Sequence, residues 1–271
     1  MTEIRRTTAC DANATVSLQP DKYVSQLQSY FEAFAVHVAE RFPKLATPFR
    51  RASAERFRML TTHGESGEDR AAIRSEDSKK DGLQQSRLAY ILKLLGVADV
   101  GTEEVRVTRF AATQARLYPM YYQVLTLSDL MGRRETIDFV ESYIDRWMSE
   151  HTQADEALED PGRFWDNLEG PTHETAEIAT RIHRGKIAFR VNDCLWANVM
   201  RPLGDPELAH TFTCYGDFSQ ILTINPNFVL TRTVTVMQGG PYCDTCIHDK
   251  RFVDAIEHPS REFYDGLGEG Q

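Results

Sequence analysis

Cysteine is scarce in this sequence, with five residues in a chain of 271. A small, odd number of thiols does not fit the disulfide framework of a secreted domain. The sequence also has no apolar run near the roughly 20 residues of a membrane span. Its N-terminal stretch lacks the apolar core of a signal peptide. We therefore expect a cytoplasmic protein whose cysteines are reduced.

Basic residues are also fewer than acidic residues. Lys and Arg number 31 against 40 Asp and Glu, which gives a formal net charge of −9. An acidic chain of this kind disfavours nucleic acid and anionic membranes as partners. We expect a small-molecule substrate, and the sequence leaves a homo-oligomer open.

Several common catalytic motifs are missing. No Gly-x-Gly-x-x-Gly follows a predicted strand, there is no P-loop, and Phe212–Phe218 contains no serine elbow. These absences argue against the usual nucleotide-binding and serine-hydrolase arrangements. A function must therefore be sought in other residues.

The periodicity of apolar residues changes along the chain. Residues 1 to about 20 are polar, and we expect a disordered or loosely docked tail there. Helical spacing then predicts helices over Asp21–Phe42, Leu83–Leu95, Val105–Met131 and Arg134–His151. Later segments predict strands over Lys186–Val191, Phe228–Met237 and Cys243–His248, with helices over Leu195–Met200 and Glu207–Ile224. This order predicts an α+β fold, with a tail (1–20), a helical N-terminal part (21–130) and a C-terminal domain (131–271) built on an antiparallel sheet with flanking helices.

Four of the five cysteines lie between Arg190 and Lys250, and three of them stand close to a carboxylate. The pairs are Asp193-Cys194, Cys214-x-x-Asp217 and Cys243-Asp244. Thiols are strong soft nucleophiles and metal ligands, and a neighbouring carboxylate can move a proton. The segment therefore indicates a site.

The same segment carries an ordered series of short motifs. Cys194 is followed by Leu203–Leu208, Cys214-x-x-Asp217, Asn225-Pro226, Arg232-Thr233 and Gly240-x-x-Cys243-Asp244. Over roughly residues 130 to 250 this series resembles the L-2-amino-thiazoline-4-carboxylic acid hydrolase family. One departure is that Thr245 and Cys246 stand where the family has an aromatic and then a basic residue. The last hairpin is also similar to ligand-binding domains of the 4-vinyl reductase type, which implies a ligand cavity.

The resemblance implies a hydrolase that opens a small cyclic C–N or C–S compound without a cofactor. It implies catalytic roles for Cys214, Asp217, Cys243 and Asp244, and substrate contacts for Cys194, Asn225, Arg232 and Gly240. A thiolate would attack the ring carbon and a carboxylate would activate water.

The spacing of these residues sharpens the expectation. Cys214 and Asp217 share a face of the predicted helix, while adjacent Cys243 and Asp244 point to opposite faces of a strand. We expect Cys243 to point inward and to share one cavity with Cys214. If Cys214 is the nucleophile, its pKa should lie below that of a free thiol.

Other interpretations remain open. Any of these cysteines can be a small buried hydrophobe. Asp217 can cap a helix or pair locally, and Asp244 can be a turn or strand-edge carboxylate. Asn225 can be a helix stop, and Arg232 a solvated strand residue. Zinc is a further alternative through Cys243, Cys246 and His248, completed by His183, Cys194 or Cys214. Against zinc, there is one Cys-x-x-Cys, and a regular strand would point its two cysteines to opposite sides. A non-catalytic small-molecule sensor is the main rival to the hydrolase.

Overall fold

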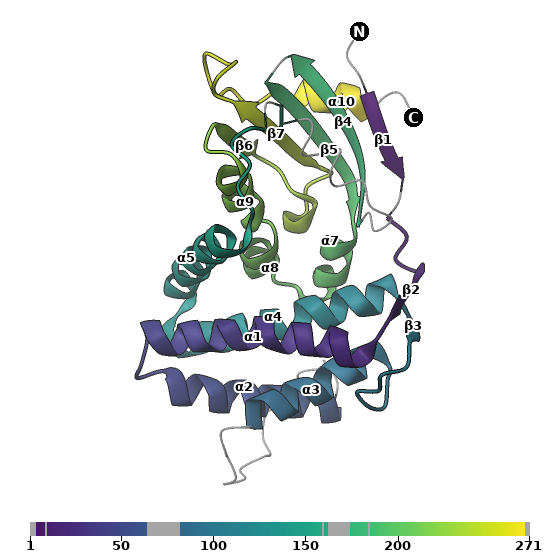
Figure 1. Cartoon of the computed structure of the whole chain (residues 1–271), viewed down its shortest axis with the longest axis vertical. Coiled ribbons are helices and arrows are strands. Elements are labelled where there is room, and N and C mark those ends of the chain that lie inside the picture. Colours follow the sequence, from purple (N-terminus) through teal and green to yellow (C-terminus); the bar gives the residue numbers. More distant parts are fainter. Residues whose placement is uncertain are drawn as a thin grey trace. The chain divides into compact units, whose positions relative to one another are not determined.

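The computed structural model describes residues 4–8, 10–63, 82–158, 160–161, 174–183 and 185–268. These fall into two compact units (Figure 1). One unit spans Ala12–Tyr143, and the other combines Met1–Asp11 with Ile144–Gln271. Within the described residues, no helix is both long enough and apolar enough to cross a membrane.

The first unit is helical. It contains α1 (Pro20–Arg41), α2 (Ala46–His63), α3 (Gly82–Leu95), α4 (Arg109–Met131) and a two-stranded ribbon of β2 (Thr15–Leu18) and β3 (Val105–Thr108). The helices form because apolar side chains recur every three or four residues, and these side chains pack together. Phe31, Phe34 and Val38 of α1 are completely buried, and the Phe34 ring meets Phe49 of α2 edge to face. Helix α5 (Arg133–His151) runs across the division between the units.

The second unit is built on a five-stranded sheet. Its strand order is β1 (Ile4–Thr8), β4 (Thr175–His183), β5 (Lys186–Cys194), β7 (Cys243–Asp249) and β6 (Phe228–Arg232). All neighbouring strands are antiparallel. Short helices α7 (Leu195–Met200), α8 (Pro206–Thr213) and α9 (Gly216–Ile224) follow β5, and α10 (Arg261–Gly268) follows β7. The predicted α+β fold, with helices first and an antiparallel sheet later, is confirmed.

The two faces of the sheet carry different side chains. On one face, Phe189, Leu230 and Ile247 pack against Ile221 and Ile224 of α9. We call this the α9 face. On the other face, Ala188 packs with Tyr242 and with Tyr264 of α10. We call this the α10 face. Because side chains alternate along a strand, each residue of β7 belongs to one of these two environments.

The N-terminal tail differs from its prediction. Ile4–Thr8 forms the edge strand beside β4, and Thr15–Leu18 pairs with Val105–Thr108. The polar composition of the segment hid both strands, because their partners lie far away in the sequence. The Val105–Thr108 end of the predicted long helix is therefore strand β3 instead. The division between the compact units falls after Tyr143, whereas the predicted boundary lies at the end of α4.

The predicted helix over Glu207–Ile224 is in fact two helices. The backbone N–H groups of Cys214 and Tyr215 both donate to the carbonyl of His210, at 2.8 and 3.1 Å, and this ends α8. Gly216 then begins α9 close to α5, where an added Cβ would lie 3.1 Å from the Met148 Cε. Cys214 is thus the C-cap of α8, and Asp217 lies in the first turn of α9.

The predicted strand over Phe228–Met237 is shorter than expected. It ends at Arg232, and Val236–Gln238 forms a short 3-10 helix, η2. The carboxylate of Asp244 accepts the backbone N–H groups of Thr233 and Val234, at 2.8 and 2.7 Å. A side chain therefore replaces the strand partner at this point and turns the chain out of the sheet.

Candidate active site

An ion pair between a buried arginine and a half-exposed aspartate lies on the α9 face. The guanidinium Nη2 of Arg232 on β6 is 2.7 Å from the Asp217 Oδ2 on α9. Its Nε donates to the Thr245 Oγ1 at 2.8 Å, and Arg232 also lies over the Phe218 ring. The Arg232 side chain is 9% exposed and the Asp217 side chain is 46% exposed. Asp217 is therefore the solvent-accessible member of the pair, and Arg232 is the buried one.

Three of the five thiols gather around this pair. Cys214, at the end of α8, accepts a long contact of 3.4 Å from Arg232 through its carbonyl oxygen. Cys243, the first residue of β7, has its sulfur 3.3 Å from the Val236 N–H. Cys194, the last residue of β5, is close enough to Cys243 and Asp217 for their charges to act on it. Residues from three separate elements thus form one cluster, although their common cavity stays a prediction.

Burial sets the protonation of these thiols. It raises the pKa of Cys194 and of Cys214 to about 12, and the charge of Asp217 adds to the rise at Cys214. The lowered pKa that was expected if Cys214 is the nucleophile is therefore not found. Burial also raises the pKa of Cys243, but the Val236 N–H and the positive charge of Arg232 oppose that rise. Arg232 also opposes the rise at Cys214, and backbone hydrogen bonds from Ala197 and Trp196 oppose it at Cys194.

Two titratable residues near the pair were not predicted from the sequence. Glu177 of β4 pairs with Val191 of β5 and is 8% exposed. Burial raises the pKa of Glu177 to about 7, and the negative charge of Asp217 contributes to that rise. His210 of α8 has its pKa lowered by burial and then by the positive charge of Arg232. Glu177 and Ala179 are two residues apart, so on a strand they share one face of the sheet. No strand was predicted there from the sequence, and Glu177 was therefore missed.

Asp244 lies on the α10 face, opposite to Cys243. It follows Cys243 on β7 and pairs with Arg190 of β5. Besides the two backbone N–H groups, its carboxylate binds the Thr233 hydroxyl and His258, with the His258 Nε2 at 3.1 Å from Oδ2. These contacts together lower the pKa of Asp244 against the effect of burial. Asp244 is therefore placed apart from the cysteine cluster.

Asn225 and Gly240 make contacts that hold the backbone in place. The fully buried Asn225 amide donates to the backbone carbonyls of Glu156 and Leu158, at 3.3 and 3.2 Å. Gly240 lies so close to the preceding turn that an added Cβ would be 2.2 Å from the Val234 Cγ1. Neither residue is among the contacts of the Arg232–Asp217 pair. Their predicted substrate contacts stay untested predictions.

The alternative zinc ligands are not assembled in one place. Strand alternation puts Cys243 on the α9 face and Cys246 and His248 on the α10 face. His248 is instead bonded through Nε2 to the Thr231 Oγ1 at 2.9 Å. In the part of the chain that the structure describes, no group of three or more His, Cys, Asp or Glu side chains could hold a metal ion.

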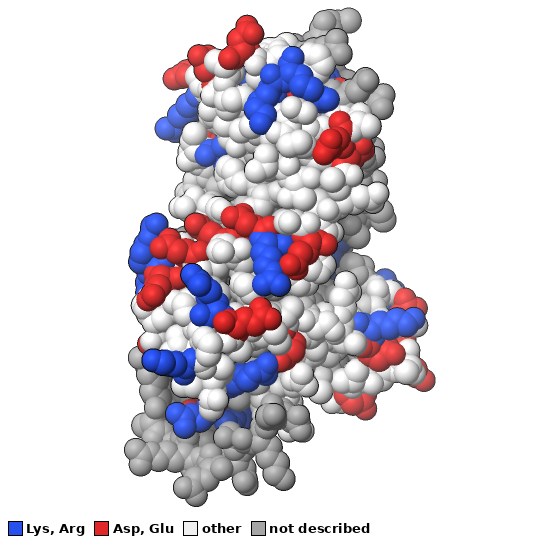
Figure 2. All heavy atoms as spheres, turned by 60° about the vertical axis from the view of Figure 1, so that its left-hand side comes forward, with Lys and Arg blue, Asp and Glu red and all other residues white. Residues whose placement is uncertain are grey.

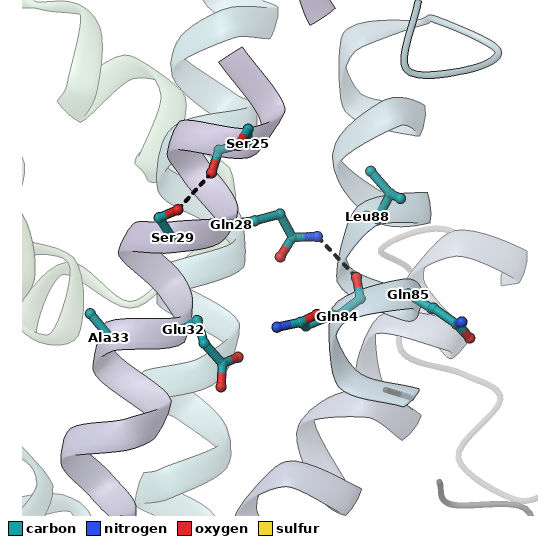
Figure 3. A pocket seen from close by; sticks show the side chains of 8 residues that line it. All are labelled: Ser25, Gln28, Ser29, Glu32, Ala33, Gln84, Gln85 and Leu88. Atoms are coloured by element: carbon teal, nitrogen blue, oxygen red, sulfur yellow. Dashed lines mark hydrogen bonds between the residues drawn. The ribbon is translucent and has the colours of Figure 1, made fainter. Parts of the chain in front are cut away.

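A polar hollow lies elsewhere, between α1 and α3 of the helical unit (Figure 3). It has a volume of about 520 Å³ and is lined by Ser25, Gln28, Ser29, Glu32, Ala33, Gln84, Gln85 and Leu88. Gln28 reaches across it and donates to the Gln84 carbonyl at 2.9 Å. Glu32 is 3.5 Å from the fully buried Arg87 guanidinium and also pairs with Arg50. None of the residues predicted for the active site lines this hollow.

The surface charges give no sign of a large basic area on the face drawn in Figure 2. Lys and Arg side chains lie interspersed there with Asp and Glu. The expected exclusion of nucleic acid as a partner stays a prediction.

The fold and the cluster together define an α+β protein with a cluster of thiols, a carboxylate and an arginine. The family model for L-2-amino-thiazoline-4-carboxylic acid hydrolase matches residues 111–247, just over half of the chain. The chain belongs to this family. The match begins inside α4, earlier than the predicted start near residue 130, and contains Glu177 and every residue of the cysteine cluster. No curated protein and no solved structure matches this chain.

Proposed function

We propose that this protein hydrolyses a small cyclic compound in which one ring carbon is bonded to nitrogen and to sulfur or a second nitrogen. The observation that carries the proposal is the gathering of three thiols around the Arg232–Asp217 pair, of which Arg232 is buried. Membership of a family named for a hydrolase supports the general class of reaction. The reaction needs no cofactor, since protein thiols and carboxylates supply the nucleophile, acid and base.

Cys243 is the proposed nucleophile. Its sulfur adds to the ring carbon, and the thiol proton passes to the nitrogen of the C=N bond. The Val236 N–H, 3.3 Å from the sulfur, and the nearby Arg232 stabilise the negative charge that develops there. Cys214 lacks this backbone donor, and its pKa of about 12 leaves it a neutral thiol that lines the site.

Glu177 is the proposed acid. With a pKa of about 7, it is close to half protonated at neutral pH and can give a proton to the ring heteroatom as its bond to carbon breaks. The carboxylate of Asp217 then activates a water molecule that releases the product from Cys243. A general acid works best when its pKa lies near the working pH, which is the value that burial gives Glu177.

Arg232 is the proposed contact for a carboxylate on the substrate. One edge of its guanidinium holds Asp217, while Nη1 makes the long contact of 3.4 Å to the Cys214 carbonyl. A planar guanidinium can bind a carboxylate through two parallel N–H groups. A small anionic ring compound would thus be held with its reactive carbon beside the thiols.

Incubation with 2-aminothiazoline-4-carboxylate and related cyclic amidines tests this function. We expect mass spectrometry to show a ring-opened product heavier than the substrate by one water molecule. The matched control is a double variant, Cys214→Ser with Cys243→Ser, at the same protein concentration. Saturable binding without any product would contradict the hydrolase and favour a sensor, which the neutral thiols at Cys194 and Cys214 also suit.

A further inference from the structure

Asp244 and His258 form a rigid polar cluster on the α10 face. Asp244 is 5% exposed, and its Oδ2 is 3.1 Å from the His258 Nε2. The other ring nitrogen of His258 is 2.8 Å from the Thr231 Oγ1, and the ring stacks on Tyr264 with centroids 5.5 Å apart. The hydroxyl of Tyr264 in turn donates to the Thr245 carbonyl at 3.0 Å. The Asp244 carboxylate is therefore fixed in place.

This fixed carboxylate holds the loop that leaves β6. Its Oδ1 accepts the N–H groups of Thr233 and Val234 at 2.8 and 2.7 Å, and Oδ2 accepts the Thr233 hydroxyl. Gly240 closes against the same loop and donates its N–H to the Thr235 carbonyl at 2.8 Å. The loop is thus held by the Asp244 carboxylate, by the Gly240 N–H and by the backbone N–H of Asp244, which donates to the Val234 carbonyl at 3.2 Å.

The loop ends at the reactive thiol on the opposite face. Val236 is the first residue of η2, and its N–H lies 3.3 Å from the Cys243 sulfur. One residue, Thr235, separates Val234, whose N–H Asp244 holds, from Val236, whose N–H meets the sulfur. A movement of the Asp244 anchor would therefore carry the donor away from Cys243.

We propose that Asp244 is a positioning residue that aims the Val236 N–H at the Cys243 sulfur from across the sheet. Its part in catalysis rests on the proposed function, whereas its effect on the Cys243 thiol does not. Asp244 acts through the loop and does not touch the substrate. This assigns a different role to the residue for which the sequence predicts direct catalysis.

The charge of Asp244 and its hydrogen bonds to the loop should change the pKa of Cys243 in opposite directions, so an experiment can tell the two effects apart. Arg232 on β6 lowers the pKa of Cys243, while Asp217 on α9 and Asp244 on β7 raise it. A fourth neighbour, Cys194, has its pKa raised to about 12 by burial and is a neutral thiol. The charge of Asp244 thus works against the thiolate, whereas its anchoring of Val236 works for the thiolate. Removing the charge alone and removing the anchor have opposite expected effects.

Alkylation of Cys243 by iodoacetamide across pH, with the modified residue located by tandem mass spectrometry, measures the thiolate. In Asp244→Asn the amide oxygen can still accept both N–H groups, and we expect a Cys243 pKa at or below that of the wild type. In Asp244→Ala the carboxylate anchor is gone, and of the contacts from residue 244 to the loop only its backbone N–H still donates to the Val234 carbonyl. We expect the pKa to rise by about one unit, with about tenfold slower alkylation at pH 8. A pKa that falls equally in both variants would overturn the proposal.

A second pair of variants tests the donor directly. Val236→Pro removes the N–H at the first position of η2, where proline is well tolerated, and Thr235 before it is already extended with φ −133° and ψ 145°. Val236→Ala is the matched control for lost packing. We expect Val236→Pro to alkylate about tenfold more slowly at Cys243 than Val236→Ala. Equal rates would overturn the proposal. Neither assay needs turnover, so a failed hydrolase leaves both readouts intact.

Discussion

At the scale of single residues, Glu177 shows how packing creates chemistry that a sequence conceals. The carboxyl is buried on β4 beside the sheet core, and its pKa rises to about 7. In the unfolded chain its pKa is 4.5. Between these values the folded protein holds a proton that the unfolded chain has lost, so stability must fall as pH rises through this window.

Glu177→Gln should remove this pH dependence. Below pH 4.5 both states of the wild type are protonated and Glu177 contributes no slope, whereas above pH 7 the folded state carries a buried charge. From pH 4 to pH 8 the wild type should lose about 3 kcal/mol of unfolding free energy through Glu177, and the variant should not lose it. Urea unfolding at a series of pH values measures the difference. The control is Glu156→Gln, an exposed carboxylate; parallel curves for wild type and Glu177→Gln would contradict the account.

The sequence identified the thiols of the cluster but not their protonation. Cys194, Cys214, Asp217, Arg232 and Cys243 were all candidates from motif order, and the fold brings them together. A lowered pKa was expected of Cys214 only if it is the nucleophile, and burial instead raises its pKa, because desolvation depends on which side chains pack around the sulfur. Glu177 was missed for the same reason, since its burial is a property of the sheet and not of its neighbours in the chain.

At the scale of elements, the alternation of β7 decides which residues can cooperate. Cys243 and Thr245 share the α9 face with Arg232, while Asp244, Cys246 and His248 share the α10 face. The sequence predicted this separation from the strand period alone. It could not predict that Asp244 would hold the loop after β6, because that contact joins residues eleven apart through a turn.

Several elements were beyond the reach of the sequence. Helices α2 and α10 and strand β4 were not predicted, and the break between α8 and α9 was missed. That break occurs where Gly216 approaches Met148, which is a tertiary contact. Long amphipathic helices such as α1 and α5 were predicted within a residue or two, because their apolar spacing is itself the reason that they fold.

Gly240 provides a test of the turn that carries Val236. An added Cβ would lie 2.2 Å from the Val234 Cγ1 and 2.9 Å from the Thr235 carbonyl oxygen. We expect Gly240→Ala to lower the free energy of unfolding by about 2 kcal/mol, because the backbone must shift to admit the methyl group. Urea unfolding measures the loss.

The matched control is Gly266→Ala in α10, where an added Cβ meets nothing within 4 Å. Alanine should stabilise that helix by a few tenths to about 1 kcal/mol. If both substitutions have the same effect, the close contact at Gly240 does not constrain the turn.

At the scale of the whole molecule, the site belongs to one of the two units. The described residues of the cluster all lie in the unit that contains Ile144–Gln271, and the family match ends within β7 of the same unit. The helical unit has its own core and its own polar hollow around Glu32. The chemistry is therefore expected to depend on the sheet, the helices α8 and α9, and the loop after β6.

The most direct test of the central claim compares the turnover of Cys243→Ser and Cys214→Ser with that of the wild type. On 2-aminothiazoline-4-carboxylate or whichever related ring the wild type opens, we predict that Cys243→Ser lowers kcat by about a thousandfold or more. Cys214→Ser should stay within about tenfold of the wild type, because that thiol lines the site without attacking. Urea unfolding of both variants checks that each is folded. Full activity in Cys243→Ser, or loss confined to Cys214→Ser, would contradict the assignment of Cys243 as the nucleophile.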